Sequence, residues 1–157
     1  MESPDVPTIG VGEGTWPSMR TTLQRIGLSE TEFVRECDAS FKQGTWFRDW
    51  QTGKGDTYSH PFTIPTNYAD TNLVPHWLAQ TDAPPFAEAV TPQTALFADC
   101  LAPKQITTPE YAFVVNYAYH LDAGKFAELL RITASPPEPA TVHLVERPPD
   151  DNDASSL

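Results

Sequence analysis

The residue best suited to chemistry in this sequence is a lysine set among aromatic side chains. Lys42 directly follows Phe41, and Trp46 lies four positions later. A lysine among aromatic side chains can lose solvation, which frees its amine to act as a hydrogen-bond donor, a base or a nucleophile. The alternative is a strand lysine whose stem packs on apolar surface while its ammonium reaches solvent. Residue type alone favours this second alternative.

A glycine-rich segment upstream of Lys42 is the second candidate. Gly10, Gly12 and Gly14 fall within five residues and leave a backbone with little side-chain cover. A helix is expected directly after them, because Pro17 suits a first helical position. A bare loop that leads into a helix N-terminus can bind an anionic or flat ligand. A simple turn without a ligand is the alternative for this segment.

The histidine, cysteine and serine patterns of the sequence are weaker indications of a functional site. His60, His76, His120 and His143 are scattered, and no His-x-x-x-His or Cys-x-x-Cys pair is present, so we expect no metal. No Gly-x-Ser-x-Gly motif indicates a nucleophilic serine. His60 can line the same pocket as Lys42, or it can be a structural residue held by hydrogen bonds.

Composition excludes several classes of function. The 157 residues carry 21 acidic and 10 basic side chains, a formal net charge of −11, which argues against binding to nucleic acid or to an anionic membrane surface. No run of 18 apolar residues is present, and the N-terminus does not resemble a secretory signal. Two cysteines, Cys37 and Cys100, fit a reduced compartment. We therefore expect a soluble, cytoplasmic protein.

The elements around Lys42 follow from local patterns. Residues 17–38 predict two short helices, with Gly27 ending the first and a capping box, Ser29 to Glu32, starting the second. Residues 40–50 predict an aromatic strand whose alternation places Lys42 and Trp46 on one face. A further strand is expected over residues 58–64.

The second half of the chain predicts shorter elements. Five prolines within residues 73–105 leave room only for short helices, near 72–80 and 86–90. The apolar run 111–119 is compatible with a strand or a helix. Asp122 predicts the start of a helix whose inward side chains are Phe126, Leu129 and Leu130. The Pro-rich, acidic residues 132–157 predict a divergent, disordered tail.

Several motifs, in order and with similar spacing, resemble the flavin-dependent tryptophan halogenases of bacteria. The first is the glycine-rich segment with its flanks, Ser3 to Ser18. The likeness covers about residues 2–131. It continues through Ala39-Ser40-Phe41-Lys42, Phe47-Arg48-Asp49-Trp50, Tyr58-Ser59-His60-Pro61-Phe62 and Tyr117-Ala118-Tyr119-His120-Leu121-Asp122-Ala123.

The resemblance implies an α/β fold, α+β within this stretch, that forms part of an FAD/NAD(P)-binding, flavin monooxygenase-like domain over residues 1–131. It also implies reduced FAD from a separate flavin reductase, halide as co-substrate, an indole- or tryptophan-type aromatic substrate and a possible homodimer. In this family hypohalous acid reaches a lysine beside the substrate, and Lys42 matches that lysine. An ammonium can activate the acid by a hydrogen bond, or the amine can form a haloamine. The resemblance thus reverses the preference for a simple strand lysine.

The resemblance also implies which residues contact the substrate and the cofactor. Lys42 is implied to be catalytic and to face the substrate together with His60 and Phe62, whereas His120 and Asp122 are implied to be structural. The glycine-rich segment is implied to be a strap along the flavin and the halide, and Glu2 to bind the adenosine ribose. The residues implied to contact the cofactor are Glu2, Ser3, Val6, Ile9, Gly10, Val11, Gly12, Glu13, Gly14 and Thr15.

Two departures from the family pattern leave alternatives open. A Gly-x-Gly-x-x-Gly motif does not precede Glu2, and Gly-Trp-x-Trp-x-Ile-Pro does not follow Arg131. We therefore expect an internal fragment that is inactive and poorly stable alone, with strands 41–50 and 58–64 lacking sheet partners. One alternative is a non-catalytic remnant or interaction module that does not bind FAD. Another is a flavin monooxygenase, which would have no evident use for Lys42.

Overall fold

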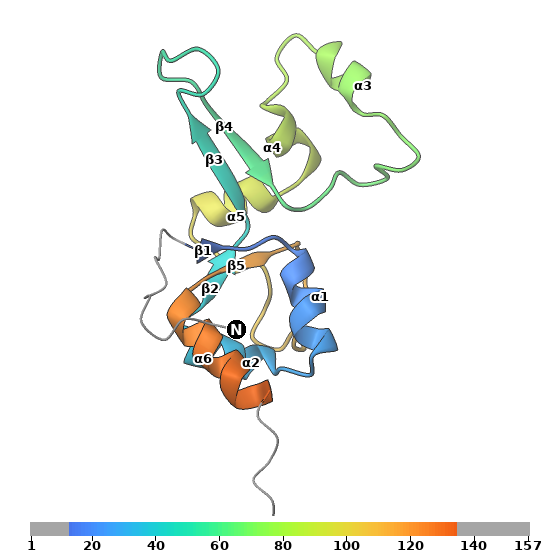
Figure 1. The fold of residues 1–157 in the computed structure, drawn as a ribbon. Coiled ribbons are helices and arrows are strands. Elements are labelled where there is room, and N and C mark those ends of the chain that lie inside the picture. Colours follow the sequence, from blue (N-terminus) through green and yellow to red (C-terminus); the bar gives the residue numbers. More distant parts are fainter. Residues whose placement is uncertain (1–12, 135–157) are drawn as a thin grey trace, which may run out of the picture.

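The computed structural model describes residues 13–134 and shows the mixed α/β fold that the sequence predicts (Figure 1). Predictions that fall on residues 1–12 and 135–157 lie outside the described residues. The elements in chain order are β1 (Glu13–Gly14), α1 (Ser18–Arg25), α2 (Glu30–Glu36), β2 (Ser40–Lys42), β3 (Gly44–Arg48), β4 (Thr57–Pro61), α3 (Val74–Leu78), α4 (Phe86–Val90), α5 (Gln93–Ala98), β5 (Ala118–Leu121) and α6 (Ala123–Ala134).

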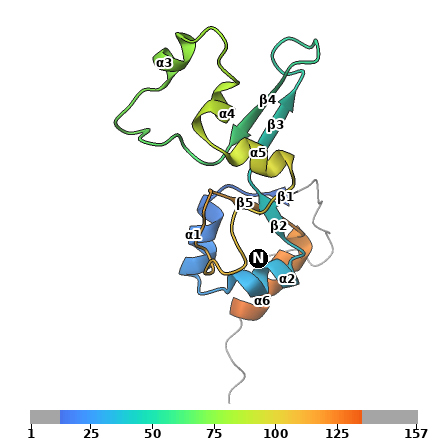
Figure 2. The same cartoon turned by 180° about the vertical axis from the view of Figure 1, so that it is seen from behind.

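The strands form two small sheets at different ends of the molecule. An antiparallel sheet with strand order β1-β5-β2 lies beside α1, α2 and α6 (Figures 1 and 2). The second sheet is the β3–β4 pair, in which Gly44 faces Pro61 and Arg48 faces Thr57. The pair extends away from the first sheet, and α4 and α5 pack against its base (Figure 2).

The prediction of one continuous strand over residues 40–50 is wrong, because the chain changes sheets at Gln43. The Gln43 side chain is buried, and its amide donates to the backbone carbonyl of Leu101 at 2.7 Å. The backbone carbonyl of Gln43 accepts from the backbone amide of Phe62 at 3.0 Å. Gly44 then allows close contact, since a Cβ there would lie 2.6 Å from the carbonyl oxygen of His60. The expected lack of sheet partners is also wrong: β2 pairs with β5, and β3 with β4.

The connection between α1 and α2 follows its sequence signals closely. Gly27 has a φ of +77°, its amide donates to Gln24, and the amide of Leu28 donates to Leu23, each at 3.1 Å. These are the two hydrogen bonds of a Schellman C-cap, and the apolar contact between Leu23 and Leu28 that usually accompanies it lies in the core. Ser29 caps α2 as predicted, with its hydroxyl accepting from the amide of Glu32 at 3.3 Å.

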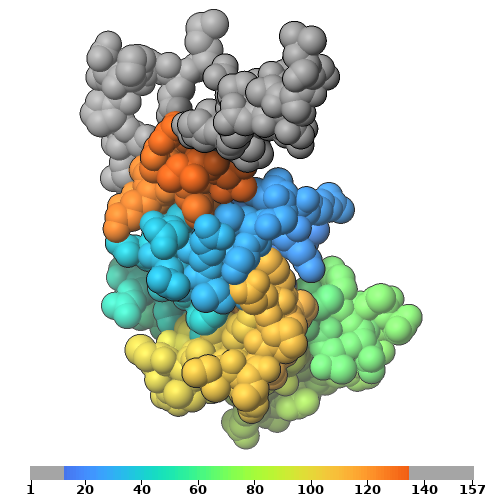
Figure 3. Space-filling model, turned by 90° about the horizontal axis from the view of Figure 1, so that it is seen from below, coloured from blue at the N-terminus to red at the C-terminus, as the bar shows by residue number. Residues whose placement is uncertain are grey.

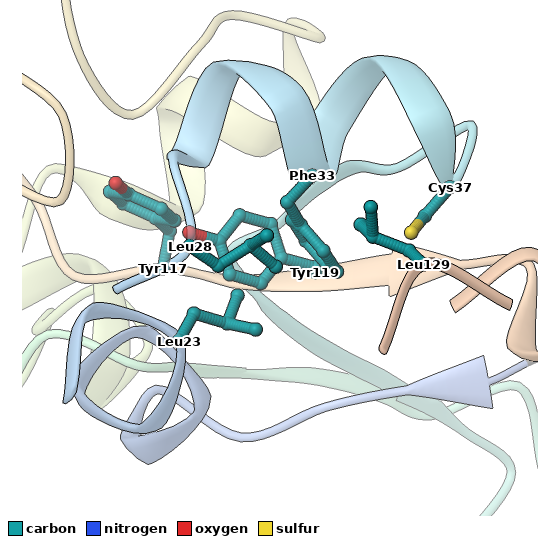
Figure 4. Close-up of a cluster of buried hydrophobic side chains, with 7 residues drawn as sticks. All are labelled: Leu23, Leu28, Phe33, Cys37, Tyr117, Tyr119 and Leu129. Carbon is teal, nitrogen blue, oxygen red and sulfur yellow. The ribbon is translucent and has the colours of Figure 1, made fainter. Parts of the chain in front are cut away.

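The core lies between the first sheet and its helices. Phe33 packs edge-on against Tyr119 with ring centroids 4.9 Å apart, and Phe126 from α6 packs against Phe33 at 5.5 Å. The buried side chains come from α1, α2, β5, α6 and the segments next to them (Figure 4), and α6 lies beside α2 (Figure 3). They are Leu23, Leu28, Phe33, Cys37, Tyr117, Tyr119 and Leu129.

The later elements agree with the sequence in part. The helices predicted near 72–80 and 86–90 are α3 and α4, whereas α5 was not predicted. Only the end of the 111–119 run becomes a strand, as β5. Asp122 caps α6, since its carboxylate accepts from the amide of Lys125 at 3.0 Å. The helix ends at Ala134, so the predicted boundary after Arg131 falls inside it.

Candidate functional site

The first sheet separates the core from a second face that carries Lys42. Phe41 is paired with Tyr119, and both rings lie on the core side, 6.4 Å apart. Because side chains alternate along a strand, the neighbouring residues Lys42 and His120 project from the other face. Gly14, His120 and Ser40 form one cross-strand row on that face, and Lys42 lies two residues beyond Ser40.

The Lys42 ammonium lies in a corner formed by two aromatic rings. Its Nζ is 5.8 Å from the ring centroid of Trp16 and 5.7 Å from that of Phe62, and the two rings are 5.7 Å apart and tilted by 48°. Within residues 13–134, no hydrogen bond or ion pair engages this ammonium. Trp16 is 64% exposed, so one wall of the corner is open. Lys42 thus retains donor capacity for a bound molecule.

Gly14 lies next to the Lys42 ammonium and borders the same corner. A Cβ built on Gly14 would lie 2.9 Å from Nζ of Lys42, and 3.3 and 3.4 Å from Cε1 and Nδ1 of His120. A side chain here would therefore occupy the space that these two groups use. β1 is also an edge strand of its sheet, so one side of its backbone is unpaired by any described residue. The position suits close approach by a flat ligand.

His120 is the third polar group of this face. Partial desolvation and the nearby charge of Lys42 lower its pKa below the ordinary 6.5, which favours the neutral imidazole. His120 also lines a hollow of about 590 Å³ together with Glu13, Asp38 and Asp122. The sequence indicated only a structural role for this histidine.

A buried polar network supports the sheet from the core side. Glu30 is 4% exposed and accepts hydrogen bonds from the hydroxyls of Tyr117 and Tyr119, the amide of Tyr111 and the ammonium of Lys104. Burial alone would raise the pKa of Glu30, but the hydrogen bonds, led by that of Lys104, outweigh it and lower the pKa. Burial and the bonds to Glu30 raise the pKa of both tyrosines.

This network reaches Lys42 through its neighbour in sequence. The Phe41 ring packs edge-on against Tyr117 at 4.9 Å, so the residue before Lys42 rests on a tyrosine held by Glu30. Sequence reasoning missed Glu30, because a glutamate in the first turn of a helix is usually exposed. The available signal was the pair Tyr117 and Tyr119, whose hydroxyls need partners once buried.

The structure brings together only some of the residues predicted for the site. Gly14, Lys42 and Phe62 lie on or beside the face just described, whereas Glu13 is paired with Leu121 and alternates to the other face. Thr15 is adjacent, but its amide and its hydroxyl both donate to the carbonyl of Tyr119, so both serve the sheet. The predicted contacts that lie outside the described residues are Glu2, Ser3, Val6, Ile9, Gly10, Val11 and Gly12.

His60 lies on a different surface from the one that Lys42 faces. It is exposed and lines an apolar groove of about 440 Å³ whose other walls include Ile64, Tyr68, Phe86 and Val90. Its predicted contact with substrate stays a prediction. In residues 13–134, no cluster of three or more His, Cys, Asp or Glu side chains is placed to hold a metal ion. None of the helices in that range is long and apolar enough to cross a membrane.

Comparison with known proteins gives consistent results. The sequence profile described as tryptophan halogenase matches residues 1–146. A tryptophan 6-halogenase of Streptomyces albogriseolus is 34% identical over 83% of this chain, and a tryptophan 7-halogenase of Lentzea aerocolonigenes is 30% identical over 83%. The chain spans 28% and 27% of the length of these two relatives.

Solved structures agree with the sequence relatives. A tryptophan halogenase from Shewanella frigidimarina is 52% identical, with a TM-score of 0.77 over 84% of this chain and 26% of its own. A flavin-dependent halogenase from a Brevundimonas species is 33% identical, with a TM-score of 0.64 over 79% of this chain and 26% of its own. The described fold therefore corresponds to about a quarter of each of these proteins.

Proposed function

The chain belongs to the tryptophan halogenase family, and from that premise we propose that it forms the lysine-bearing part of a flavin-dependent halogenase. The observation that carries the proposal is the Lys42 ammonium, which lies between the rings of Trp16 and Phe62 and has no polar partner among the described residues. The proposed substrate is an indole-type aromatic, such as tryptophan. The proposed co-substrates are halide and oxygen.

When bound, reduced FAD with oxygen and halide would supply hypohalous acid. Lys42 then acts on this acid: its ammonium donates a hydrogen bond to the oxygen, which withdraws electrons from the halogen and makes it more electrophilic. The aromatic ring of the substrate attacks the halogen, the ring proton leaves, and the oxygen departs as water. A covalent alternative, in which the amine of Lys42 carries the halogen as a haloamine, uses the same position.

The aromatic corner suits this chemistry in two ways. The rings of Trp16 and Phe62 exclude water from two sides of the ammonium, which strengthens its hydrogen bond to a small acid. They also offer flat apolar surface next to the lysine, against which an indole can stack. Orientation of the substrate carbon toward the halogen would then account for a large part of the rate.

The described end of the strap fits an FAD site at two points. The outer edge of β1 and the bare Cα of Gly14 allow close backbone approach to a flat ring system. We propose Glu13 and Gly14 as the strap residues nearest to the Lys42 side. A separate flavin reductase as the source of reduced FAD, and a homodimer, stay predictions from the family.

The test of this proposal is Lys42→Ala in a full-length halogenase that contains this segment. Reduced FAD, oxygen, bromide and indole or tryptophan are supplied, and the brominated product is measured by mass spectrometry. We expect a loss of roughly 100-fold or more, since an electrostatic donor to the reacting oxygen is removed. Lys54→Ala, in the exposed turn between β3 and β4, is the matched control and should leave the rate unchanged.

Consumption of reduced FAD separates the possible outcomes. If Lys42→Ala still consumes reduced FAD at the normal rate while product is lost, the defect lies after formation of hypohalous acid, as proposed. Normal halogenation by the variant would refute the role of Lys42. Separately, the 157-residue chain should bind FAD weakly or not at all in a fluorescence titration, because it lacks a Gly-x-Gly-x-x-Gly motif for the pyrophosphate.

A further inference from the structure

We propose that His120 positions the Lys42 ammonium and makes its action depend on pH. The inference rests on the proposed role of Lys42 and adds a residue for which the sequence indicated only a structural role. It follows from three features of the first sheet: the register that places both side chains on one face, the shared contact with Gly14, and the set of charges around the imidazole.

The register brings His120 and Lys42 together. His120 is paired with Ser40 on β2 and with Gly14 on β1, while Lys42 is paired with Ala118. The two side chains are therefore diagonal neighbours on one face of adjacent strands, a separation that long side chains span. No rearrangement of the sheet is needed for them to interact.

Their common proximity to Gly14 limits how far apart the two nitrogens lie. The position that a Cβ of Gly14 would take lies 2.9 Å from Nζ of Lys42 and 3.4 Å from Nδ1 of His120. The two nitrogens thus lie near a single point without a direct hydrogen bond between them, and one water molecule can join them. A neutral imidazole with its proton on Nε2 has a free acceptor at Nδ1. It can hold one of the three ammonium hydrogens and leave the other two for the aromatic corner.

Charges around His120 determine when this acceptor is present. Lys42 faces it from β2, Glu13 comes from β1, Asp122 follows β5, and Asp38 precedes β2. Asp38 is engaged by Lys125, which reduces its effect on the imidazole. Desolvation first and the charge of Lys42 second lower the pKa of His120.

The position of the Lys42 ammonium should therefore change as pH falls through the pKa of His120. Above its pKa, His120 is neutral and orients the ammonium. Below that pKa, the imidazolium has no acceptor nitrogen and adds a second positive charge beside Lys42, which repels the ammonium from its position. Halogenation should therefore fall on the acid side of a pKa below 6.5.

The first experiment tests the coupling without any halogenation. The imidazole of His120 is titrated by nuclear magnetic resonance in the full-length protein, in wild type and in Lys42→Gln. Loss of the lysine charge should raise the pKa of His120, and Lys54→Gln should leave it unchanged. An unchanged pKa of His120 in Lys42→Gln would overturn the proposal, even if the protein proves not to be a halogenase.

The second experiment tests the positioning role in the reaction. His120→Gln keeps polarity and similar size but cannot titrate. It should lower kcat roughly tenfold or more at pH 7, with little change in KM, and it should remove the acid-side fall of kcat, since misplacement of a reacting group costs rate rather than binding. Reduced FAD should be consumed at the normal rate. An acid-side fall identical to that of the wild type would overturn the proposal, whereas complete absence of halogenation by the wild type would refute only the proposed function.

Discussion

Replacing the buried carboxylate of Glu30 gives a sharp test of how the lysine-bearing sheet is held in place. Glu30→Ala removes the acceptor shared by Lys104, Tyr117 and Tyr119, and no water reaches most of this space, since the Glu30 and Lys104 side chains are 6% and 10% exposed. The substitution leaves a buried ammonium and two buried hydroxyls without their carboxylate. We expect the chain to lose much of its stability.

The expected loss of stability follows from the buried groups that lose their partner. Breaking a buried ion pair by removal of one partner typically costs about 3–5 kcal/mol. Glu30→Gln keeps the volume and one acceptor oxygen, so it should cost less, about 1.5–3 kcal/mol, the usual value for hydrogen bonds to a charged group. Because small domains are stable by only about 5–15 kcal/mol, Glu30→Ala can leave the chain largely unfolded.

The assay is urea unfolding followed by tyrosine and tryptophan fluorescence, at pH 7 and at pH 3.5. The folded pKa of Glu30 lies below the ordinary 4.5, so the unfolded chain binds more protons in this range. The stabilisation is therefore complete above about pH 4.5 and is lost as pH falls through the folded pKa. The difference in unfolding free energy between wild type and Glu30→Gln should be larger at pH 7 than at pH 3.5.

Two controls decide whether burial is the cause. Glu128→Gln removes an exposed carboxylate paired with Arg131 and should have no measurable effect, because both side chains are more than half exposed. The double variant Glu30→Met/Lys104→Met leaves no unpaired charge. Its loss of unfolding free energy should therefore be smaller, by about 1–3 kcal/mol, than the sum of the losses in the two single variants. A Glu30→Ala variant as stable as wild type, or additive single losses, would refute this account of the network.

Two glycine substitutions test the geometry around the site. Gly14→Ala places a methyl group against the flexible end of Lys42 and beside His120. It should lower the free energy of unfolding by less than about 1 kcal/mol but reduce the rate of halogenation by roughly tenfold or more. A normal rate of halogenation in the full-length enzyme would contradict the described corner. Gly44→Ala instead meets backbone, with its Cβ 2.6 Å from the carbonyl of His60, so it should cost about 1–3 kcal/mol and separate β3 from β4. Hydrogen exchange of the β3 and β4 amides measures this separation, and unchanged protection would show that the strands accommodate the methyl group.

The sequence predicted the elements whose signals are local. Gly27 and Ser29 marked the turn between α1 and α2 because a left-handed glycine and a capping serine act within one turn of chain. Asp122 marked the start of α6 for the same reason. The alternating pattern of residues 40–50 could not show that Gln43 is held by Leu101 and Phe62, since both partners lie far away in sequence. Tertiary hydrogen bonds therefore decided where that strand divides.

The candidate site shows the same division between local and long-range information. Lys42 was predicted as an amine among aromatic residues, but its neighbours by sequence, Phe41 and Trp46, are not the rings that flank its ammonium. Phe41 packs against Tyr117 on the core side, and Trp46 of β3 packs against Phe97 of α5. The rings beside the ammonium belong to Trp16 and Phe62, which lie outside β2 and reach Lys42 only through the tertiary fold.

The alternation of β2 connects stability to the proposed chemistry. Phe41 rests on the Tyr117 ring that Glu30 holds, and Lys42, the next residue, projects from the opposite face. A shift of one residue in the register of β2 would exchange the two side chains, placing an ammonium against Tyr117 and Tyr119 and a phenyl ring in the corner. The aromatic contacts of Phe41 with Tyr117 and Tyr119 oppose this shift, because it would remove both of them. The core therefore determines on which side of the sheet the lysine lies.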